Sequence, residues 1–165
     1  MKYDNSEIRR QDRLLAEDRA MELIKESEYG FLAMADEGAG YGVPVNYAFD
    51  GGNSLYIHCA GEGKKLVCLA KSPCVTFCIV GKSQIAAEKF TAYFESVILS
   101  GSAVIVSSPE EKRRAIELIL EKYSPNDLEK GRVAAASAMS IVGIIRIDVD
   151  KFSGKCKKPK KPANQ

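Results

Sequence analysis

The spacing of apolar and polar positions divides the chain into short strands and a few amphipathic helices. Between residues 16 and 28, Ala20, Leu23 and Ile24 recur at helical spacing among charged side chains, which predicts a first helix. Shorter runs rich in Val, Ile, Tyr and Phe predict six strands. The strands are expected at 29–35, 43–49, 54–59, 74–80, 93–106 and 140–149.

Glycine and proline refine the expected strands. The segment 50–53 is Asp-Gly-Gly-Asn, which predicts an antiparallel hairpin between 43–49 and 54–59 because glycine tolerates positive φ. Pro44 has no N–H to donate, so we expect it near the start or on an open edge of its strand. Gly101 interrupts the longest run, which indicates a bulge or bend.

Three further helices are predicted. Residues 63–70 have helical spacing and stop before Pro73, residues 126–138 give a weaker signal, and Ser108-Pro109-Glu110-Glu111 is typical of a helix start. Antiparallel hairpins dominate and no βαβ alternation runs through the chain. The pattern therefore favours a mainly β (α+β) barrel or sandwich with peripheral helices over a Rossmann sheet.

Length and composition predict one domain followed by a tail. The chain has 165 residues, of which 45% are apolar and 28% charged, as in an ordinary globular domain. The net charge is +2, but residues 151–165 hold six lysines and no acid, so residues 1–150 carry −4. We expect a domain over 1–154 and a flexible Lys/Pro-rich tail over 155–165. A mildly acidic domain argues against nucleic acid as the main partner, and only the tail suits a polyanion.

Other residue types exclude several classes of site. Five cysteines without a C-x-x-C pair fit neither a secreted disulfide framework nor a zinc knuckle, and we expect most to be buried thiols. One histidine, His58, leaves little basis for a metal site or a hydrolase triad. With no apolar run of roughly 20 residues and no signal-peptide core, we expect a cytoplasmic protein without membrane contact.

The segment 56–66 is the most informative for chemistry. A predicted strand ends at a loop with two glycines, and Lys64 and Lys65 fall at the start of the next predicted helix. Free amide groups and the helix dipole favour an anion there, so the pattern suits a phosphate. A solvated basic pair after a flexible loop explains the same residues, and the pattern is neither a P-loop nor a G-x-G-x-x-G fingerprint.

Several segments in order resemble the pyridoxamine phosphate oxidase-like flavin-binding split barrels, and more narrowly the branch that includes nitroimidazole-resistance proteins. The likeness runs from about Arg9 to Lys155. The segments are 43–47, 58–60, 63–66, 73–81 and 93–103. The resemblance implies a six-stranded antiparallel split β-barrel of Greek-key topology and a homodimer with paired FMN sites at its interface.

Site residues follow from the resemblance position by position. One strand would lie along the isoalloxazine ring and give it backbone hydrogen bonds; its residues are Pro44, Val45, Asn46 and Tyr47. The next strand end would approach the ribityl chain and phosphate, with Ala60 allowing close passage; its residues are His58, Cys59 and Ala60. The segment Lys64, Lys65 and Leu66 would neutralise the phosphate through its two lysines. Glu95 and Ser96 would supply a polar contact from the partner subunit.

Some of these positions allow simpler explanations. Lys64 departs from close relatives, which often have histidine there, so a role that the family gives to that histidine does not carry over. His58 also suits a hydrogen-bonded structural histidine, and Tyr47 a core aromatic. Cys59 lies where buried thiols are common.

The resemblance implies an FMN-dependent oxidoreductase that passes electrons from a reduced nicotinamide or another donor to a small organic acceptor, such as a nitroaromatic or nitroimidazole. The flavin would carry the chemistry, so no catalytic residue is assigned. Two alternatives stay open. One is a non-catalytic flavin-binding module for storage, sensing or electron carriage. The other is a relative that holds haem, with His58 as its only histidine ligand, or a deazaflavin.

Overall fold

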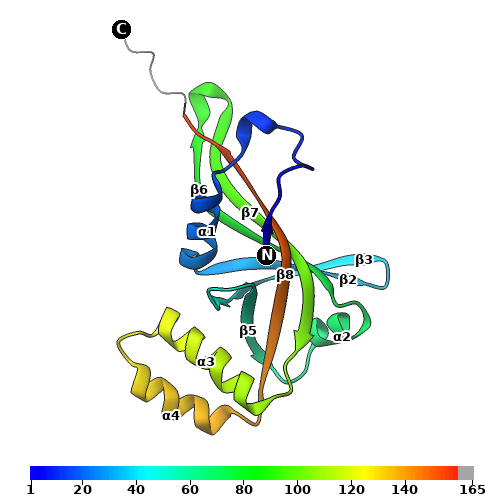
Figure 1. The fold of residues 1–165 in the computed structure, drawn as a ribbon, viewed down its shortest axis with the longest axis vertical. Helices are drawn as coiled ribbons and strands as arrows, with labels where there is room; N and C mark the ends of the chain where they lie inside the picture. The colour runs from blue at the N-terminus through cyan, green and yellow to red at the C-terminus, as the bar shows by residue number, and fades with distance from the viewer. Residues whose placement is uncertain (160–165) are drawn as a thin grey trace.

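The computed structural model describes residues 1–159, which form one twisted open sheet with helices around it (Figure 1). The strands are β1 (Lys2–Tyr3), β2 (Tyr29–Asp36), β3 (Ala39–Asn46), β4 (Ala48–Phe49), β5 (Ser54–Ala60), β6 (Cys74–Ala86), β7 (Thr91–Ile105) and β8 (Val142–Lys157). The helices are α1 (Glu17–Glu26), α2 (Lys64–Lys71), α3 (Pro109–Tyr123) and α4 (Leu128–Ala138), with short 3₁₀ turns η1 (Gln11–Arg13) and η2 (Ala87–Lys89).

The sheet has the order β3-β2-β6-β7-β8-β5-β4, and β1 pairs in parallel with β8. All other pairs are antiparallel. Six strands have seven or more residues, while β1 and β4 have two each. The expected antiparallel split barrel with peripheral helices is therefore confirmed, although the described residues form eight strands where six were expected.

The four predicted helices form close to their expected bounds. Ser108 caps α3 as the sequence indicates, because its hydroxyl accepts a hydrogen bond from the Glu111 N–H at 3.3 Å. Within residues 1–159 no helix is long and apolar enough to cross a membrane. The five cysteines are free, but only Cys68 and Cys156 are buried, so the expectation that most are buried is wrong.

The predicted strand over 43–49 is divided in two by Tyr47, which corrects the expected hairpin. Residues 43–46 belong to β3 and pair with β2, whereas Ala48 and Phe49 form β4 and pair with β5. The tight β2–β3 turn, with positive φ at Glu37 and Gly38, holds the first part on the opposite edge of the sheet. The chain thus passes from one edge to the other within a single residue, and Pro44 lies on an edge strand as predicted.

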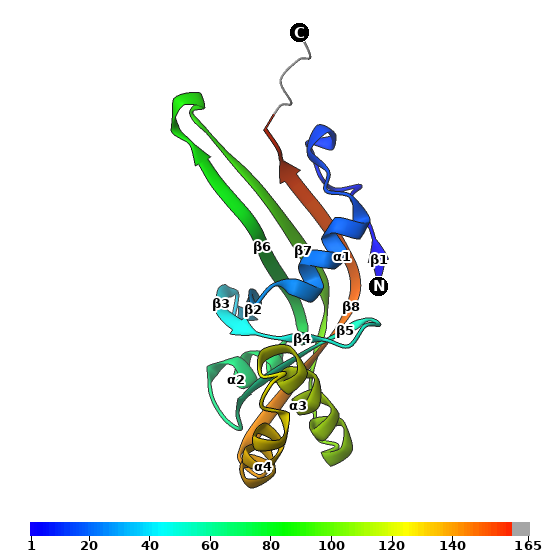
Figure 2. The same ribbon diagram turned by 90° about the vertical axis from the view of Figure 1, so that its left-hand side faces the viewer.

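The strand β6 continues six residues beyond its predicted end, and β7 begins two residues before its predicted start, so that the two strands form an arm that projects from the body of the protein (Figure 2). The segment 82–84 is Lys-Ser-Gln and is exposed, so it lacks the buried alternation that predicts a strand. Near the tip, Ile85 and Phe90 are 73% and 98% exposed. The arm is held by pairing between its own two strands rather than by a core.

The last strand also exceeds its prediction. β8 continues to Lys157, so the expected domain boundary after residue 154 falls inside a strand. Its second half alternates buried Phe152, Gly154 and Cys156 with more exposed positions, mostly lysines, which made the segment resemble a tail. Residues 158 and 159 of the expected tail are exposed and lie beyond the strand, and residues 160–165 lie outside the described residues.

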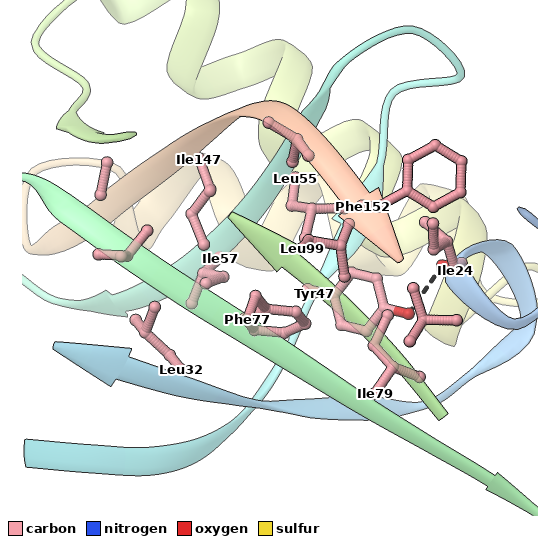
Figure 3. Close-up of a cluster of buried hydrophobic side chains, with 14 of the residues drawn as sticks. Ile24, Leu32, Tyr47, Leu55, Ile57, Phe77, Ile79, Leu99, Ile147 and Phe152 are labelled. Carbon is pink, nitrogen blue, oxygen red and sulfur yellow. Dashed lines mark hydrogen bonds between the residues drawn. The ribbon is translucent and has the colours of Figure 1, made fainter. Parts of the chain in front are cut away.

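The core lies between the strands of the curved sheet, and Ile24 of α1 packs at one side of it (Figure 3). Leu32, Ile57, Phe77 and Leu99 come from four different strands and are at most 1% exposed. The predicted irregularity at Gly101 is confirmed by a register shift between Ser100 and Gly101. A Cβ at Gly101 would lie 2.0 Å from the carbonyl oxygen of Asp148, so no other residue fits this backbone approach.

Candidate functional site

The residues expected to bind a phosphate meet where β5 ends and α2 begins. Gly63 precedes the helix with φ +130°, a conformation that favours glycine, and α2 has neither a side-chain cap nor an acid in its first turn. Instead, Lys64 and Lys65 occupy that turn, where the helix dipole disfavours cations. A bound anion would offset this unfavourable placement of charge.

The two lysines have different surroundings. The Nζ of Lys64 lies 2.8 Å from Asp36 Oδ2 and 4.6 Å from the centre of the Tyr41 ring. This ion pair raises the pKa of Lys64 and lowers the pKa of Asp36. Lys65 is half-buried and forms no ion pair within residues 1–159. Lys65 is therefore the lysine that remains free to meet an anion.

The end of β5 lies close to Lys65. Burial raises the pKa of the Cys59 thiol, and the positive charge of Lys65 acts in the opposite direction. Ala60 is exposed, and Leu66 packs at the margin of the core. A Cβ at Gly143 of β8 would lie 2.8 Å from the carbonyl oxygen of Ala60, so glycine is needed for this close strand pairing.

Only some residues of the strand that was expected to bind the flavin ring are exposed to solvent. Pro44 and Asn46 are exposed on the edge strand β3, whereas Val45 packs against the core. The side-chain amide of Asn46 donates to the carbonyl oxygen of Glu28 at 2.8 Å. The free edge of β3 is therefore the part of this segment that is open to a ligand.

Tyr47 is a structural residue. Its side chain is fully buried, its hydroxyl donates to the carbonyl oxygen of Ile24 at 2.7 Å (Figure 3), and its ring packs edge-on against Phe77. Its backbone N–H donates to the hydroxyl of Tyr123 at 3.0 Å. Its carbonyl oxygen lies 2.7 Å from that hydroxyl and 3.0 Å from Lys122 Nζ. Both backbone groups are thus occupied, in contrast to the expectation that they serve a flavin.

The end of α3 supplies two residues that sequence reasoning missed. Lys122 donates to the carbonyl oxygens of Ser27 and Tyr47, at 2.7 and 3.0 Å, and its Nζ lies 3.9 Å from the centre of the Tyr47 ring. Burial lowers its pKa to about 8, so it is still mostly an ammonium at neutral pH. Tyr123 also reaches the carbonyl oxygen of Glu28 at 2.5 Å. Basic and aromatic residues are common at helix ends, so the sequence alone held no signal for this role.

Two expected site residues, Asn46 and His58, line one cleft. Its volume is about 520 Å³, and its other walls come from α3, α4 and Val142 of β8. His58 is exposed, and its imidazole forms no hydrogen bond with any described residue. Across residues 1–159, no group of three or more His, Cys, Asp or Glu side chains is placed to hold a metal.

Glu95 and Ser96 lie apart from the other expected residues and point to opposite sides of β7. Glu95 shares the side of buried Val97, and both its carboxylate oxygens accept from Arg19 of α1, at 2.7 and 3.1 Å. This pairing lowers the pKa of Glu95. Ser96 lies on the outer side with exposed Ile98. β6 and β2 separate β7 from β3 in the sheet, so neither residue reaches the β3 edge within one chain.

A known family profile and several solved structures are similar to this chain. The profile of a family described as pyridoxamine 5'-phosphate oxidase matches residues 16–156. No curated protein matches the chain. A proposed 5-nitroimidazole antibiotic resistance protein from Bacteroides thetaiotaomicron VPI-5482 is similar with a TM-score of 0.72 and 23% identity, covering 87% of this chain and 86% of that one.

Two other solved structures share the fold, with sequence identities below that of the resistance protein. An FAD-binding protein from Mesorhizobium loti has a TM-score of 0.65 and 21% identity, covering 88% of this chain and 98% of that one. An FAD- and haem-binding protein from Mycobacterium smegmatis has a TM-score of 0.76 and 14% identity, covering 90% and 75%. At these identities the likeness to the solved structures is one of fold.

Proposed function

Because the chain belongs to the pyridoxamine 5'-phosphate oxidase family, we propose that it binds FMN and acts as an oxidoreductase on a small organic acceptor. The observation that carries the proposal is the start of α2. There, just after the loop 61–63 that follows β5, the start of α2 has no side-chain cap, and Lys65 forms no ion pair within residues 1–159. Both features suit a phosphate monoester such as that of FMN.

In this proposal the described residues bind and orient the cofactor. Lys65 and the free N–H groups at the start of α2 hold the phosphate, while Lys64, paired with Asp36, adds positive charge at longer range. The exposed edge of β3 at Pro44 and Asn46 lies along the ring system. Lys122 and Tyr123 fix the end of that edge through the backbone of Tyr47.

When bound, the flavin would supply the electron transfer, accepting a hydride from a reduced nicotinamide and passing two electrons to the acceptor. For a nitro compound, the acceptor takes up two electrons and two protons and loses one water to become a nitroso compound. One proton derives from the nicotinamide hydride equivalent and one from solvent. The chain then needs only to position the reactants and limit water.

The proposal includes a homodimer, for which an apolar sheet face is the support. On the outer side of adjacent strands, Tyr29, Phe31, Val80 and Ile98 are 62%, 47%, 63% and 44% exposed. Phe31 pairs with Cys78, and Cys78 pairs with Ile98, so these side chains form one continuous patch. Exposed patches of this kind mark association surfaces. Ser96 pairs with Val80 in the patch, so it suits a contact with the partner's cofactor, while Glu95 does not.

The test is the absorption spectrum of the purified full chain, followed by titration with FMN and with FAD. We expect the visible bands of an oxidised flavin and tighter binding of FMN. A chain that takes up neither flavin contradicts the proposal. Tighter binding of FAD would retain a flavoprotein but overturn the choice of FMN.

A non-catalytic flavin module uses the same residues, so kinetics must separate it from an enzyme. Rapid reoxidation of the reduced protein by a nitroaromatic under anaerobic conditions supports the oxidoreductase. Reduction with no turnover of any acceptor supports the module. Haem binding through exposed His58 is tested by a Soret band after haem addition, which the His58→Ala variant should lack.

A further inference from the structure

The cleft between the α3–α4 hairpin and the sheet has a chemical character that the cofactor site does not explain. Its lining consists of Asn46, His58, Ile116, Ile119, Leu120, Tyr123, Ser124, Gly131, Ala134, Ala135, Ala138 and Val142. None of these is Asp, Glu, Lys or Arg. Four other clefts on the described chain each contain at least one such residue. A volume of about 520 Å³ lies in the ordinary range of small-molecule sites.

The cleft exists because α4 packs incompletely. No residue of α4 is buried, and its side facing the cleft carries only glycine and alanine. Gly131 allows the two helices to approach closely, since a Cβ there would lie 2.6 Å from Leu120 Cδ2. Elsewhere the small side chains leave space beside Ile116 and Ile119, so α3 contributes apolar surface that α4 does not fill.

Polar groups occur on one wall, toward β3 and β5. The amide of Asn46 and the hydroxyl of Tyr123 are already used in hydrogen bonds to backbone groups. The His58 imidazole and the Ser124 hydroxyl have no hydrogen-bond partner among residues 1–159, so they remain available to a ligand. An occupant should therefore be largely apolar and uncharged, with one polar group at the end near His58.

We propose that this cleft binds an uncharged, largely apolar small molecule whose single polar substituent points to His58. Asn46 and His58 belong both to the cleft wall and to the expected cofactor contacts, so an occupant would lie next to the flavin. Resting on the proposed function, the occupant is the electron acceptor. The absence of charged lining excludes phosphorylated vitamins and carboxylic acids as good occupants, because desolvating their charge would find no compensating partner.

The test uses the neutral fluorescent aromatic N-phenyl-1-naphthylamine, titrated into the full chain with and without FMN. Ala134→Trp places a large ring in the cleft from an exposed helical position. Val133→Trp adds the same ring on the neighbouring residue, which is 74% exposed and outside the cleft. We expect Ala134→Trp to weaken probe binding by about tenfold or more, and Val133→Trp to change it less than twofold.

Circular dichroism establishes that each variant is folded, and Ala138→Phe fills the same cleft if Ala134→Trp does not fold. Lack of probe binding by the parent chain, or equal binding by Ala134→Trp, overturns the proposal. Displacement of the probe by FMN assigns the cleft to the cofactor and also overturns it. A dimer lost on Ala134→Trp assigns it to an interface between copies, with the same consequence.

The two proposals fail separately. If the probe binds with the expected pattern but no flavin is taken up, the cleft stands and the proposed function falls. If FMN binds normally to all variants while the probe does not bind to the parent chain, the proposed FMN binding stands and the proposal for the cleft falls. With FMN loaded, we also expect Ala134→Trp to raise the KM for an uncharged nitroaromatic while its affinity for FMN stays unchanged.

Discussion

Arg19 of α1 and Glu95 of β7 form a two-pronged ion pair, with Nε 3.1 Å from one carboxylate oxygen and Nη2 2.7 Å from the other. The two side chains are only 29% and 13% exposed, so solvent screens the pair weakly. The pair fastens the first helix to the middle of the sheet across 76 residues of sequence. The role of Glu95 is therefore to stabilise the packing of α1 against the sheet.

Glu95→Gln should lower stability in a pH-dependent way. The pKa of Glu95 is lowered from an ordinary value of 4.5, so the unfolded chain binds its proton at higher pH than the folded chain. The stabilisation is complete above pH 4.5 and is lost as the pH falls through the lowered pKa. We expect Glu95→Gln to cost about 1–2 kcal/mol at pH 7, measured by urea unfolding.

That difference should shrink toward zero in acid. Glu22→Gln is the matched control, since Glu22 also pairs with Arg19 but is 55% exposed, and it should cost about 0.5 kcal/mol or less. A Glu95→Gln cost that is equal at pH 3 and pH 7 would contradict the assigned role of the charge.

Lys65→Met should weaken FMN binding while leaving riboflavin binding unchanged, because riboflavin lacks the phosphate. The expected loss is about 10- to 100-fold, as for one charge-assisted contact to phosphate. Lys64→Met should lose less, since Lys64 is paired with Asp36. Lys71→Met, at the opposite end of α2, serves as control. Equal losses for FMN and riboflavin would argue against a phosphate at Lys65.

Ile98→Lys should prevent dimer formation, because it places a charge at the centre of the apolar patch on the outer sheet face. Light scattering should then give the mass of one chain, and flavin affinity should fall because the partner's Ser96 is lost. Val133→Lys, at an exposed position on α4, should leave both properties unchanged. A dimeric Ile98→Lys variant would show that this face is not the interface.

Tyr123→Phe should destabilise the corner between β3 and β4. Without the phenol, the buried Tyr47 N–H loses its acceptor, at a cost of about 1–3 kcal/mol. Tyr93→Phe removes a hydroxyl that forms no hydrogen bond with residues 1–159, and should be nearly neutral in thermal unfolding. FMN affinity should fall in Tyr123→Phe alone, since the end of β3 is no longer fixed.

Gly101→Ala should be strongly destabilising, by about 3 kcal/mol or more, because the new methyl group would meet the backbone of Asp148. Gly40→Ala is the contrasting substitution, since nothing lies within 4 Å of a Cβ there. The thermal midpoint of Gly40→Ala should stay within a few degrees of the parent chain. Similar midpoints for both variants would contradict the close approach at the bulge.

The sequence predicted elements where one side of a segment faces the core. The helices α1 and α3, the run Val75–Ile79 and the bulge at Gly101 all carry such patterns, and each forms as expected. The arm over residues 81–92 and the second half of β8 were missed for a physical reason. Their strands are stabilised mainly by backbone pairing with neighbouring strands. Such pairing does not require an alternation of apolar and polar residues, so the sequence pattern does not reveal it.

The sequence predicted several residues of the candidate site, but it did not predict which of them pair within the chain and which remain open to a ligand. Sequence motifs indicate Lys64 and Lys65 equally, and only the fold places Asp36 against the first. Likewise, adjacent residues of a strand face opposite sides, so Glu95 and Ser96 have separate roles. Lys122 and Tyr123 were missed because their acceptors are backbone groups far away in the chain.

A single residue, Tyr47, connects the strands at the two edges of the sheet, so the connecting chain is too short to let the edges move apart freely. Any motion that widens the gap between β3 and β5 must pull directly on this peptide and release its N–H from Tyr123. The rate of hydrogen–deuterium exchange at the Tyr47 amide should therefore report how often the two edges separate. A ligand that bridges the two edges should lower this exchange rate, whatever its chemistry.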